Sequence, residues 1–174
     1  RYKDAKIFFD STLKLDESNF LTHFYLGKIA KESKDYPTAI ASFEKALRDK
    51  TVKLKALIER GICFIAMQKY DLAISELDKA ITLYQKDQEA KPTEQQILYI
   101  HYFIAMAYEL VRDLDKAIEN WEIINKKKKN FKDVSEKLSQ YKELQENDKM
   151  KDYLTSSRDE YIEICKAICS AINL

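Results

Sequence analysis

Four short segments of this chain repeat one pattern, and each segment contains an alanine in the same place. The first three of these alanines are 34 residues apart and the fourth follows 44 residues later, at Ala5, Ala39, Ala73 and Ala117. A bulky residue comes next in each segment, at Phe9, Phe43, Leu77 and Trp121, and a more compact one after it, at Thr12, Ala46, Ala80 and Ile124. A 34-residue period with this content is typical of helical hairpins stacked into a solenoid. The chain is therefore predicted to be all-α.

Small residues alternate with large ones along the predicted helices. Gly27, Gly61 and Ala105 are small enough to let the two helices of a hairpin approach closely. Large residues then fill the space toward the next hairpin, so that no hairpin buries its apolar face alone. Each buried leucine or aromatic side chain contributes roughly 1.5–3 kcal/mol. We expect the stack to be stable only as a unit.

Composition excludes several classes of partner. The chain has 30 lysines and arginines against 29 acidic residues, a formal net charge of +1. This balance creates no long-range field toward nucleic acid or an anionic membrane, so neither is an expected partner. No apolar run is long enough to span a bilayer. Three cysteines cannot all pair with one another, and a disulfide framework is not expected in so helical a chain.

The repeat pattern divides the chain into five predicted segments. Residues 1–16 form the second helix of a truncated repeat, residues 17–50, 51–84 and 93–129 form full hairpins, and residues 130–174 form C-terminal capping helices. The ten extra residues before the fourth alanine predict an inserted loop at about Gln85 to Pro92. Because the chain begins within a repeat, we expect it to be part of a longer protein.

Capping signals support these boundaries. Pro37 lies near the first turn of a second helix, where the missing N–H costs least. Thr93 to Gln96 predicts a capping box, and Ser157 to Glu160 predicts another at the start of the last helix. We also expect one helix over Phe131 to Gln145, a break near Asn147-Asp148 and a turn or short helix at Met150 to Leu154.

The most complete repeat resembles the tetratricopeptide repeat family. The resemblance is carried by Leu26-Gly27, Asp35-Tyr36, Ala39-Ile40, Phe43 and Lys45-Ala46-Leu47, and it extends over residues 1 to about 129. It implies a right-handed superhelix with a concave groove that binds protein. His23 and His101 stand where the family usually has a bulky aromatic residue, and we expect both to be structural.

The resemblance also implies which residues line the groove, since the family uses a fixed set of first-helix positions. These are Phe24, Tyr25, Lys28, Ile58, Glu59, Ile62, Ile65, Tyr99, Tyr102, Phe103 and Met106. Much of this set is aromatic or aliphatic, which is typical of an interaction site rather than of a solvated surface. Three occupants are open: a partner's helix or extended peptide, the chain's own C-terminal helix, and a second copy.

One kind of ligand is not expected. Family members that bind EEVD-type chaperone tails hold the terminal carboxylate with several lysine, asparagine and arginine side chains. The matching residues here are Phe24, Lys28, Glu59, Tyr99 and Phe103. A single cation among them cannot hold that carboxylate. We predict no binding of such tails.

No constellation for chemistry is visible. Neither histidine has a serine, cysteine or acid placed for catalysis, and Cys165 and Cys169 lack further metal ligands. Lys126 to Lys129 is interpreted as a solvated helix end, where cations favour the helix dipole. We predict that the chain is not an enzyme and that it binds neither a cofactor nor a metal.

A second, narrower resemblance concerns the C-terminal segment. Its residues are Asn130 to Val134, Lys137-Leu138, Tyr141, Leu144 and Asn147 to Leu154, continuing into Glu160 to Cys165. This segment is similar to the stretch that follows the repeats in large, membrane-anchored, periplasmic proteins of the spirochaete flagellar collar. The resemblance implies a non-catalytic scaffold for motility in the periplasm.

Two alternatives are a cytoplasmic adaptor and a regulatory segment of a larger enzyme. The full-length gene distinguishes them, since a membrane segment favours the collar and an adjoining catalytic motif favours the enzyme.

Overall fold

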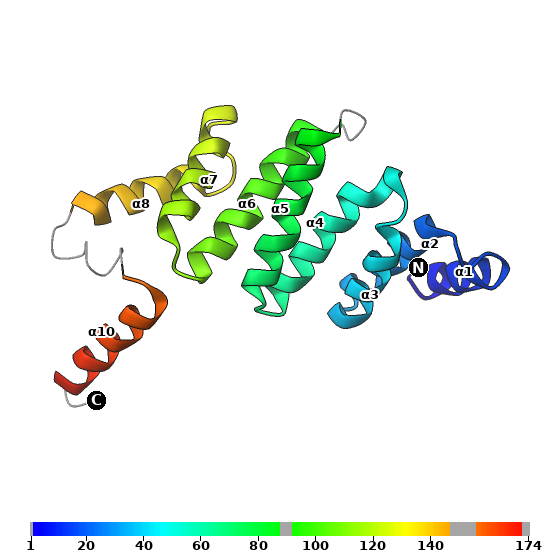
Figure 1. Ribbon diagram of the computed structural model, residues 1–174, viewed down its shortest axis with the longest axis horizontal. Helices are drawn as coiled ribbons and strands as arrows, with labels where there is room; N and C mark the ends of the chain where they lie inside the picture. The colour runs from blue at the N-terminus through cyan, green and yellow to red at the C-terminus, as the bar shows by residue number, and fades with distance from the viewer. Residues whose placement is uncertain (1, 88–91, 147–155, 172–174) are drawn as a thin grey trace. The chain divides into compact units, whose positions relative to one another are not determined.

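The computed structural model describes residues 2–87, 92–146 and 156–171, and the regular secondary structure within them is α-helix (Figure 1). The helices are α1 (Tyr2–Leu15), α2 (Phe20–Glu32), α3 (Tyr36–Ala46), α4 (Lys50–Ala66), α5 (Tyr70–Lys86), α6 (Glu94–Leu110), α7 (Leu114–Lys127), α8 (Val134–Glu146) and α10 (Arg158–Ala171). The predicted all-α fold of helical hairpins is confirmed.

The chain forms two compact units, residues 1–103 and residues 104–174, which divide within α6 and are described separately. In the first unit α2 packs on α3, α3 on α4, and α4 on α5. Neighbouring helices therefore follow one another in space as they do in sequence, which Figure 1 shows from blue to green. This is the packing expected of stacked hairpins.

The repeated alanines and bulky residues form the core. Ala39 and Ala73 are completely buried, as are Phe43 and Leu77, which follow them on α3 and α5. In the second unit Ala117, Trp121 and Ile124 on α7 are buried to the same degree. The recurring pattern in the sequence is therefore a pattern of buried positions.

Two glycines bring the helices of each hairpin together in the first unit. A Cβ atom added at Gly27 on α2 would lie 2.7 Å from two ring carbons of Phe43 on α3. A Cβ atom at Gly61 on α4 would lie 2.7 Å from Cγ of Leu77 on α5. Real Cβ atoms do not approach other carbons this closely, so glycine is the residue that permits the contact.

The turn inside each hairpin repeats as well. Lys34, Gln68 and Arg112 have φ angles of 60°, 59° and 68°, in the left-handed region. In each turn the next backbone N–H reaches back five residues to a helix carbonyl, at 2.9 Å in all three. This is the Schellman arrangement that closes a helix C-terminus. These positions have the same 34- and 44-residue spacing as the alanines.

The predicted caps are present. Pro37 stands in the first turn of α3, where the Asp35 carboxylate accepts a hydrogen bond from the Thr38 N–H at 3.3 Å. Thr93 and Gln96 exchange the hydrogen bonds of a capping box at 2.8 and 3.2 Å. Each cap satisfies backbone donors that the first turn of a helix leaves free.

The helix predicted from Phe131 begins later, at Val134. Asn130 and Lys132 have φ angles of 60° and 50°, which a helix cannot contain. Phe131 therefore lies in a turn and is only 7% exposed. The predicted break at 147–148 and the short element at 150–154 lie outside the described residues.

The last helix, α10, is fixed at its start. The Ser157 N–H donates to Glu160 at 2.8 Å, which confirms the predicted capping box. This hydrogen bond and that from the Ser157 hydroxyl lower the pKa of the Glu160 carboxyl. The Arg112 guanidinium stacks 3.9 Å from the centre of the Tyr161 ring. The α6–α7 turn thus holds the first turn of α10 within the second unit.

The close approach at Gly61 predicts a specific mutational pattern. Gly61→Ala should lower the free energy of unfolding by about 1 kcal/mol. Overpacking costs about 1–3 kcal/mol, and the higher helix propensity of alanine offsets about 1 kcal/mol of that cost. Leu77→Ala should cost about 2–5 kcal/mol. Urea unfolding of the double variant should show a loss smaller than the sum, since the new methyl group fills part of the cavity. Additive losses would show that the two side chains do not compete for one space.

The left-handed turns predict a stabilising change. Gln68→Gly should raise the free energy of unfolding by about 1 kcal/mol, because glycine has no Cβ to clash at positive φ. Ser75→Gly, at an exposed position inside α5, is the control and should lower stability by about 1 kcal/mol. Thermal unfolding of both variants measures the difference. A destabilised Gln68→Gly protein would contradict the assigned turn.

Candidate partner-binding face

The predicted groove residues of the first unit lie on α2, α4 and the part of α6 up to Phe103. Tyr25 is 43% exposed and Lys28 is also exposed. The others that lie on this surface are half-buried: Glu59, Ile62, Ile65, Tyr99, Tyr102 and Phe103. We call this set, with Tyr25 and Lys28, the first-helix face. Met106 is half-buried and belongs to the second unit.

Two predicted contact residues lie beneath the face rather than on it. Phe24 is 6% exposed, and its ring packs 5.7 Å from the ring of Phe43. Ile58 is 9% exposed. Both side chains are buried, and the Phe24 ring packs against α3. Because both are buried, we expect them to support the face rather than to contact a partner directly.

Helix α1 also contributes a residue beside the face. The ring of Phe9 on α1 stacks on Tyr25 at a centroid distance of 5.5 Å and an interplanar angle of 5°. Leu21, one turn before Tyr25 on α2, is 42% exposed. The family pattern assigns the face to first helices only, so it gave no signal for a contribution from α1.

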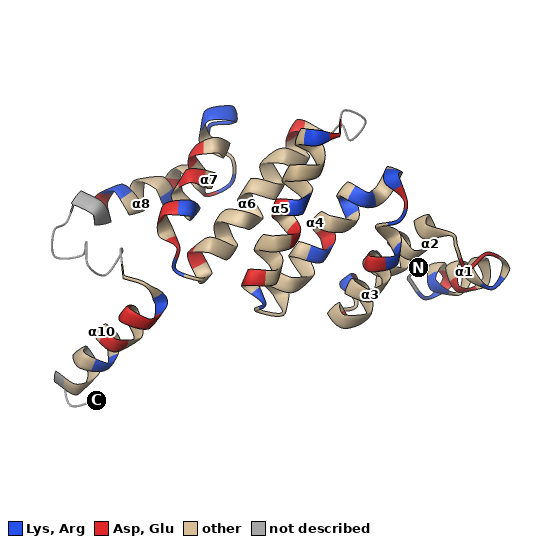
Figure 2. Ribbon diagram, viewed as in Figure 1, with Lys and Arg blue, Asp and Glu red and all other residues tan. Residues whose placement is uncertain are grey.

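An aromatic cluster occupies the α6 part of the face. Tyr99 and Phe103 stack at 6.2 Å, and Tyr102 meets Phe103 edge-on at 5.8 Å. No charged residue occurs on α6 between Glu94 and Glu109, and Figure 2 shows this helix almost entirely tan. Aromatic pairs of this geometry are rigid and present both apolar area and hydroxyl groups to a ligand.

An ion pair crosses the face between α2 and α4. The Lys31 ammonium lies 2.6 Å from a Glu59 carboxylate oxygen, and the two side chains are only 20% and 18% exposed. Partial burial makes this pair stronger than a surface pair. It ties together two helices that belong to successive hairpins, and it neutralises the acidic group at the centre of the face.

Burial also determines the protonation state of the Cys63 thiol on α4. Cys63 is completely buried, and burial raises the pKa of its thiol to about 11, with Lys31 lowering and Glu59 raising it further. The thiol is therefore protonated at neutral pH and is a poor nucleophile.

The second unit repeats the ion pair with the charges reversed. Glu109 on α6 bonds both carboxylate oxygens to the Lys137 ammonium on α8 at 2.8 Å, and the spacing of 28 residues equals that from Lys31 to Glu59. The Tyr141 hydroxyl donates to the same carboxylate. Burial and this hydrogen bond raise the pKa of Tyr141. Helix α8 thus holds the position of the first helix of a further hairpin.

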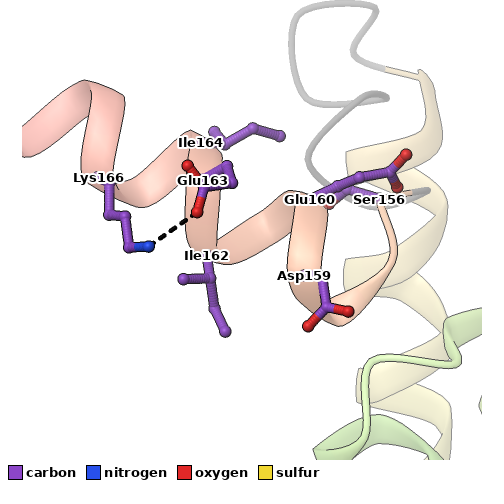
Figure 3. Close-up of a pocket in the computed structure, with 7 residues that line it drawn as sticks. All are labelled: Ser156, Asp159, Glu160, Ile162, Glu163, Ile164 and Lys166. Carbon is purple, nitrogen blue, oxygen red and sulfur yellow. Dashed lines mark hydrogen bonds and ion pairs between the residues drawn. The ribbon is translucent and has the colours of Figure 1, made fainter.

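A separate hollow follows the surface of α10. It has a volume of about 990 Å³ and is lined by Ser156, Asp159, Glu160, Ile162, Glu163, Ile164 and Lys166 (Figure 3). Ile162 and Ile164 point to opposite sides of the helix, and Ile162 is 41% exposed. A salt bridge of 2.8 Å joins Lys166 to Glu163. Helix α10 supplies all of these residues except Ser156, which precedes it, so the hollow is open rather than enclosed.

The two histidines considered as candidates from the sequence are buried. His23 and His101 are each 7% exposed, and His23 Nε2 lies 3.2 Å from the carbonyl oxygen of Glu17. Within the described ranges, no group of three histidine, cysteine, aspartate or glutamate residues is arranged to hold a metal ion. No helix in the described part of the chain is long and apolar enough to cross a membrane.

Comparison with known proteins supports the repeat. Residues 54–87 match the family model of the tetratricopeptide repeat. A crystal structure of MamA is 21% identical, covers 93% of this chain and 87% of its own, and superposes with a TM-score of 0.66. The first TPR of Spaghetti (RPAP3), bound to the HSP90 peptide SRMEEVD, is 14% identical, with coverages of 76% and 97% and a TM-score of 0.61. No curated protein matches in sequence. These structures establish the fold.

The ion pair between α2 and α4 is testable by charge exchange. Lys31→Glu should lower the free energy of unfolding by about 1–3 kcal/mol, because it sets two half-buried carboxylates against each other. Lys31→Glu/Glu59→Lys should recover most of that loss. The same exchange at the exposed pair Lys6 and Asp10 should change stability by less than about 0.5 kcal/mol. Equal effects at both pairs would show that Lys31 and Glu59 do not cooperate.

Proposed function

We propose that this protein is a non-catalytic interaction module whose first-helix face binds a helix or extended segment of another protein. The observation that carries the proposal is the concentration of half-buried aromatic and aliphatic side chains on one face, with Tyr25 and Leu21 exposed beside them. Apolar patches of this kind normally mark sites of protein recognition. The fold and the repeat match support the same class of function, since stacked hairpins supply extended binding surfaces.

The face has the composition of an interface core. Tyrosine and phenylalanine are enriched at such cores, and charged residues are depleted. The α6 part of the face meets both conditions through Tyr99, Tyr102 and Phe103. The structure bound to an HSP90 peptide shows a relative in fold that binds a short peptide. This chain lacks the cations that the sequence comparison requires for such a tail, so we expect a different ligand.

The proposal is tested by selecting binders. The full chain would be used to select from a displayed peptide library, and affinities would be measured by fluorescence anisotropy. Tyr102→Glu and Phe103→Glu should weaken binding by about thirtyfold or more, because they place a charge in the centre of an apolar contact. Leu72→Glu, at a position on α5 that is 49% exposed, is the matched control and should leave affinity unchanged. Helical circular dichroism verifies folding of each variant.

Two results would contradict the proposal. One is the failure of any peptide or protein to bind the face. The other is an equal loss on Leu72→Glu and Phe103→Glu. The alternative in which the chain's own tail occupies the face predicts instead that Ile162→Asp strengthens peptide binding, because it releases the competitor.

A more specific proposal concerns the assembly. The resemblance of residues 130–165 to the segment that follows the repeats in spirochaete flagellar collar proteins supports a scaffold role in a periplasmic motor structure. If this proposal is correct, the full-length gene should encode a membrane anchor and should lie among motility genes. Sequencing the complete gene and its genomic neighbours tests this. An adjoining catalytic domain would favour the regulatory alternative.

A further inference from the structure

Two lysines on the first-helix side of the molecule have no acidic partner. Lys28 on α2 and Lys55 on α4 are exposed, and neither forms an ion pair with the described residues. Lys28 is three residues before Lys31, and Lys55 is four residues before Glu59. Residues three or four apart share one face of a helix. Both lysines therefore lie on the same face as the ion pair.

The ion pair shows where α2 and α4 come together near the two lysines. Consecutive first helices run in the same direction, because the second helix of each hairpin returns the chain. From the 2.6 Å contact between Lys31 and Glu59, three residues back along α2 is about 4.5 Å and four residues back along α4 is about 6 Å. Each lysine thus lies about one turn before the ion pair on its own helix. Both belong to the cationic part of the first-helix face.

The rest of the face does not compensate this charge. Glu59 is already bonded to Lys31, and Glu32 is the last residue of α2, on the far side of Lys31 from Lys28. The α6 part of the face has no charged residue between Glu94 and Phe103. The two unpaired lysines therefore set the sign of the charge that a ligand meets.

The cationic and apolar parts lie in a fixed order along α4. Lys55 comes first, Glu59 follows one turn later, and Ile62 and Ile65 follow that. Seven residues separate Lys55 from Ile62, which is about 10 Å along the helix. An extended segment covers that distance in about three residues.

We propose that the partner segment carries a pair of acidic side chains about three residues, when extended, from a bulky apolar pair. The acids meet Lys28 and Lys55, and the apolar side chains contact Ile62, Ile65 and the α6 aromatics. This inference rests on the proposed function and adds the chemistry of the partner. The carboxylates belong to side chains within the segment, since Lys28 is the only cation among the five positions that would hold a terminal carboxylate, and the other four are Phe24, Glu59, Tyr99 and Phe103.

The test uses two synthetic peptides, both blocked at their termini. One has two glutamates and, three residues further on, a leucine and a phenylalanine, and the other has glutamines in place of the glutamates. The full chain should bind the glutamate peptide about tenfold more tightly at low salt. Lys28→Gln/Lys55→Gln should remove this preference, so that the two peptides bind with equal affinity. Lys45→Gln/Lys53→Gln is the control for net charge and should keep the preference.

Four outcomes would overturn the inference. If both peptides bind equally and Phe103→Glu weakens both, the face binds apolar segments without the acids, and the proposed function stands. If neither binds and library selection also yields no binder, both proposals fail. If the same peptides with a free C-terminus bind and the blocked peptides do not, the lysines recognise a chain end. If Ile162→Asp strengthens binding of both peptides, α10, with Asp159 and Glu163 beside Ile162, is the occupant.

Discussion

The fold depends on the close approach of two helices within each hairpin, and in the first unit glycine makes that approach possible. Phe43 and Leu77 lie where a side chain on Gly27 or Gly61 would otherwise be. This contact sets the spacing within a hairpin, and the spacing decides which residues of the first helix remain at the surface. The buried alanines repeat the same constraint on the second helices. The smallest residues thus determine the helix spacing, and the helix spacing determines which binding residues are exposed.

Sequence periodicity predicted the helices, their caps and the buried positions, because burial and capping are determined by neighbours within about one turn. It did not predict how deeply each first-helix side chain is buried. Phe24 and Ile58 occupy positions that the family pattern assigns to the groove, yet they are buried, since side-chain length and the neighbouring helix decide how far each one reaches. It also missed the left-handed turns at Lys34 and Gln68, because neither residue type indicates positive φ.

The C-terminal region contains one contact that the sequence did not indicate. Residues 130–174 were predicted as capping helices because the repeated alanine pattern ends before them. Helix α8 nevertheless contacts α6 through Lys137, at the same 28-residue spacing that joins Lys31 to Glu59. The spacing is visible in the sequence, but one charged pair among many does not stand out from it. Only contact distances distinguish a structural ion pair from two solvated side chains.

The reversal of charge between these two ion pairs has a consequence for how the chain is ordered. Lys31 requires an acid on the following first helix, whereas Glu109 requires a base. The equivalent positions at the intervening junction are Ile65 and Phe103, which require neither. Exchanging hairpins would set lysine against lysine or leave a half-buried charge beside an apolar residue. The side chains at each junction are thus complementary to the neighbouring hairpin and not to the others. The hairpins are therefore not interchangeable, and the side chains at the junctions determine their order.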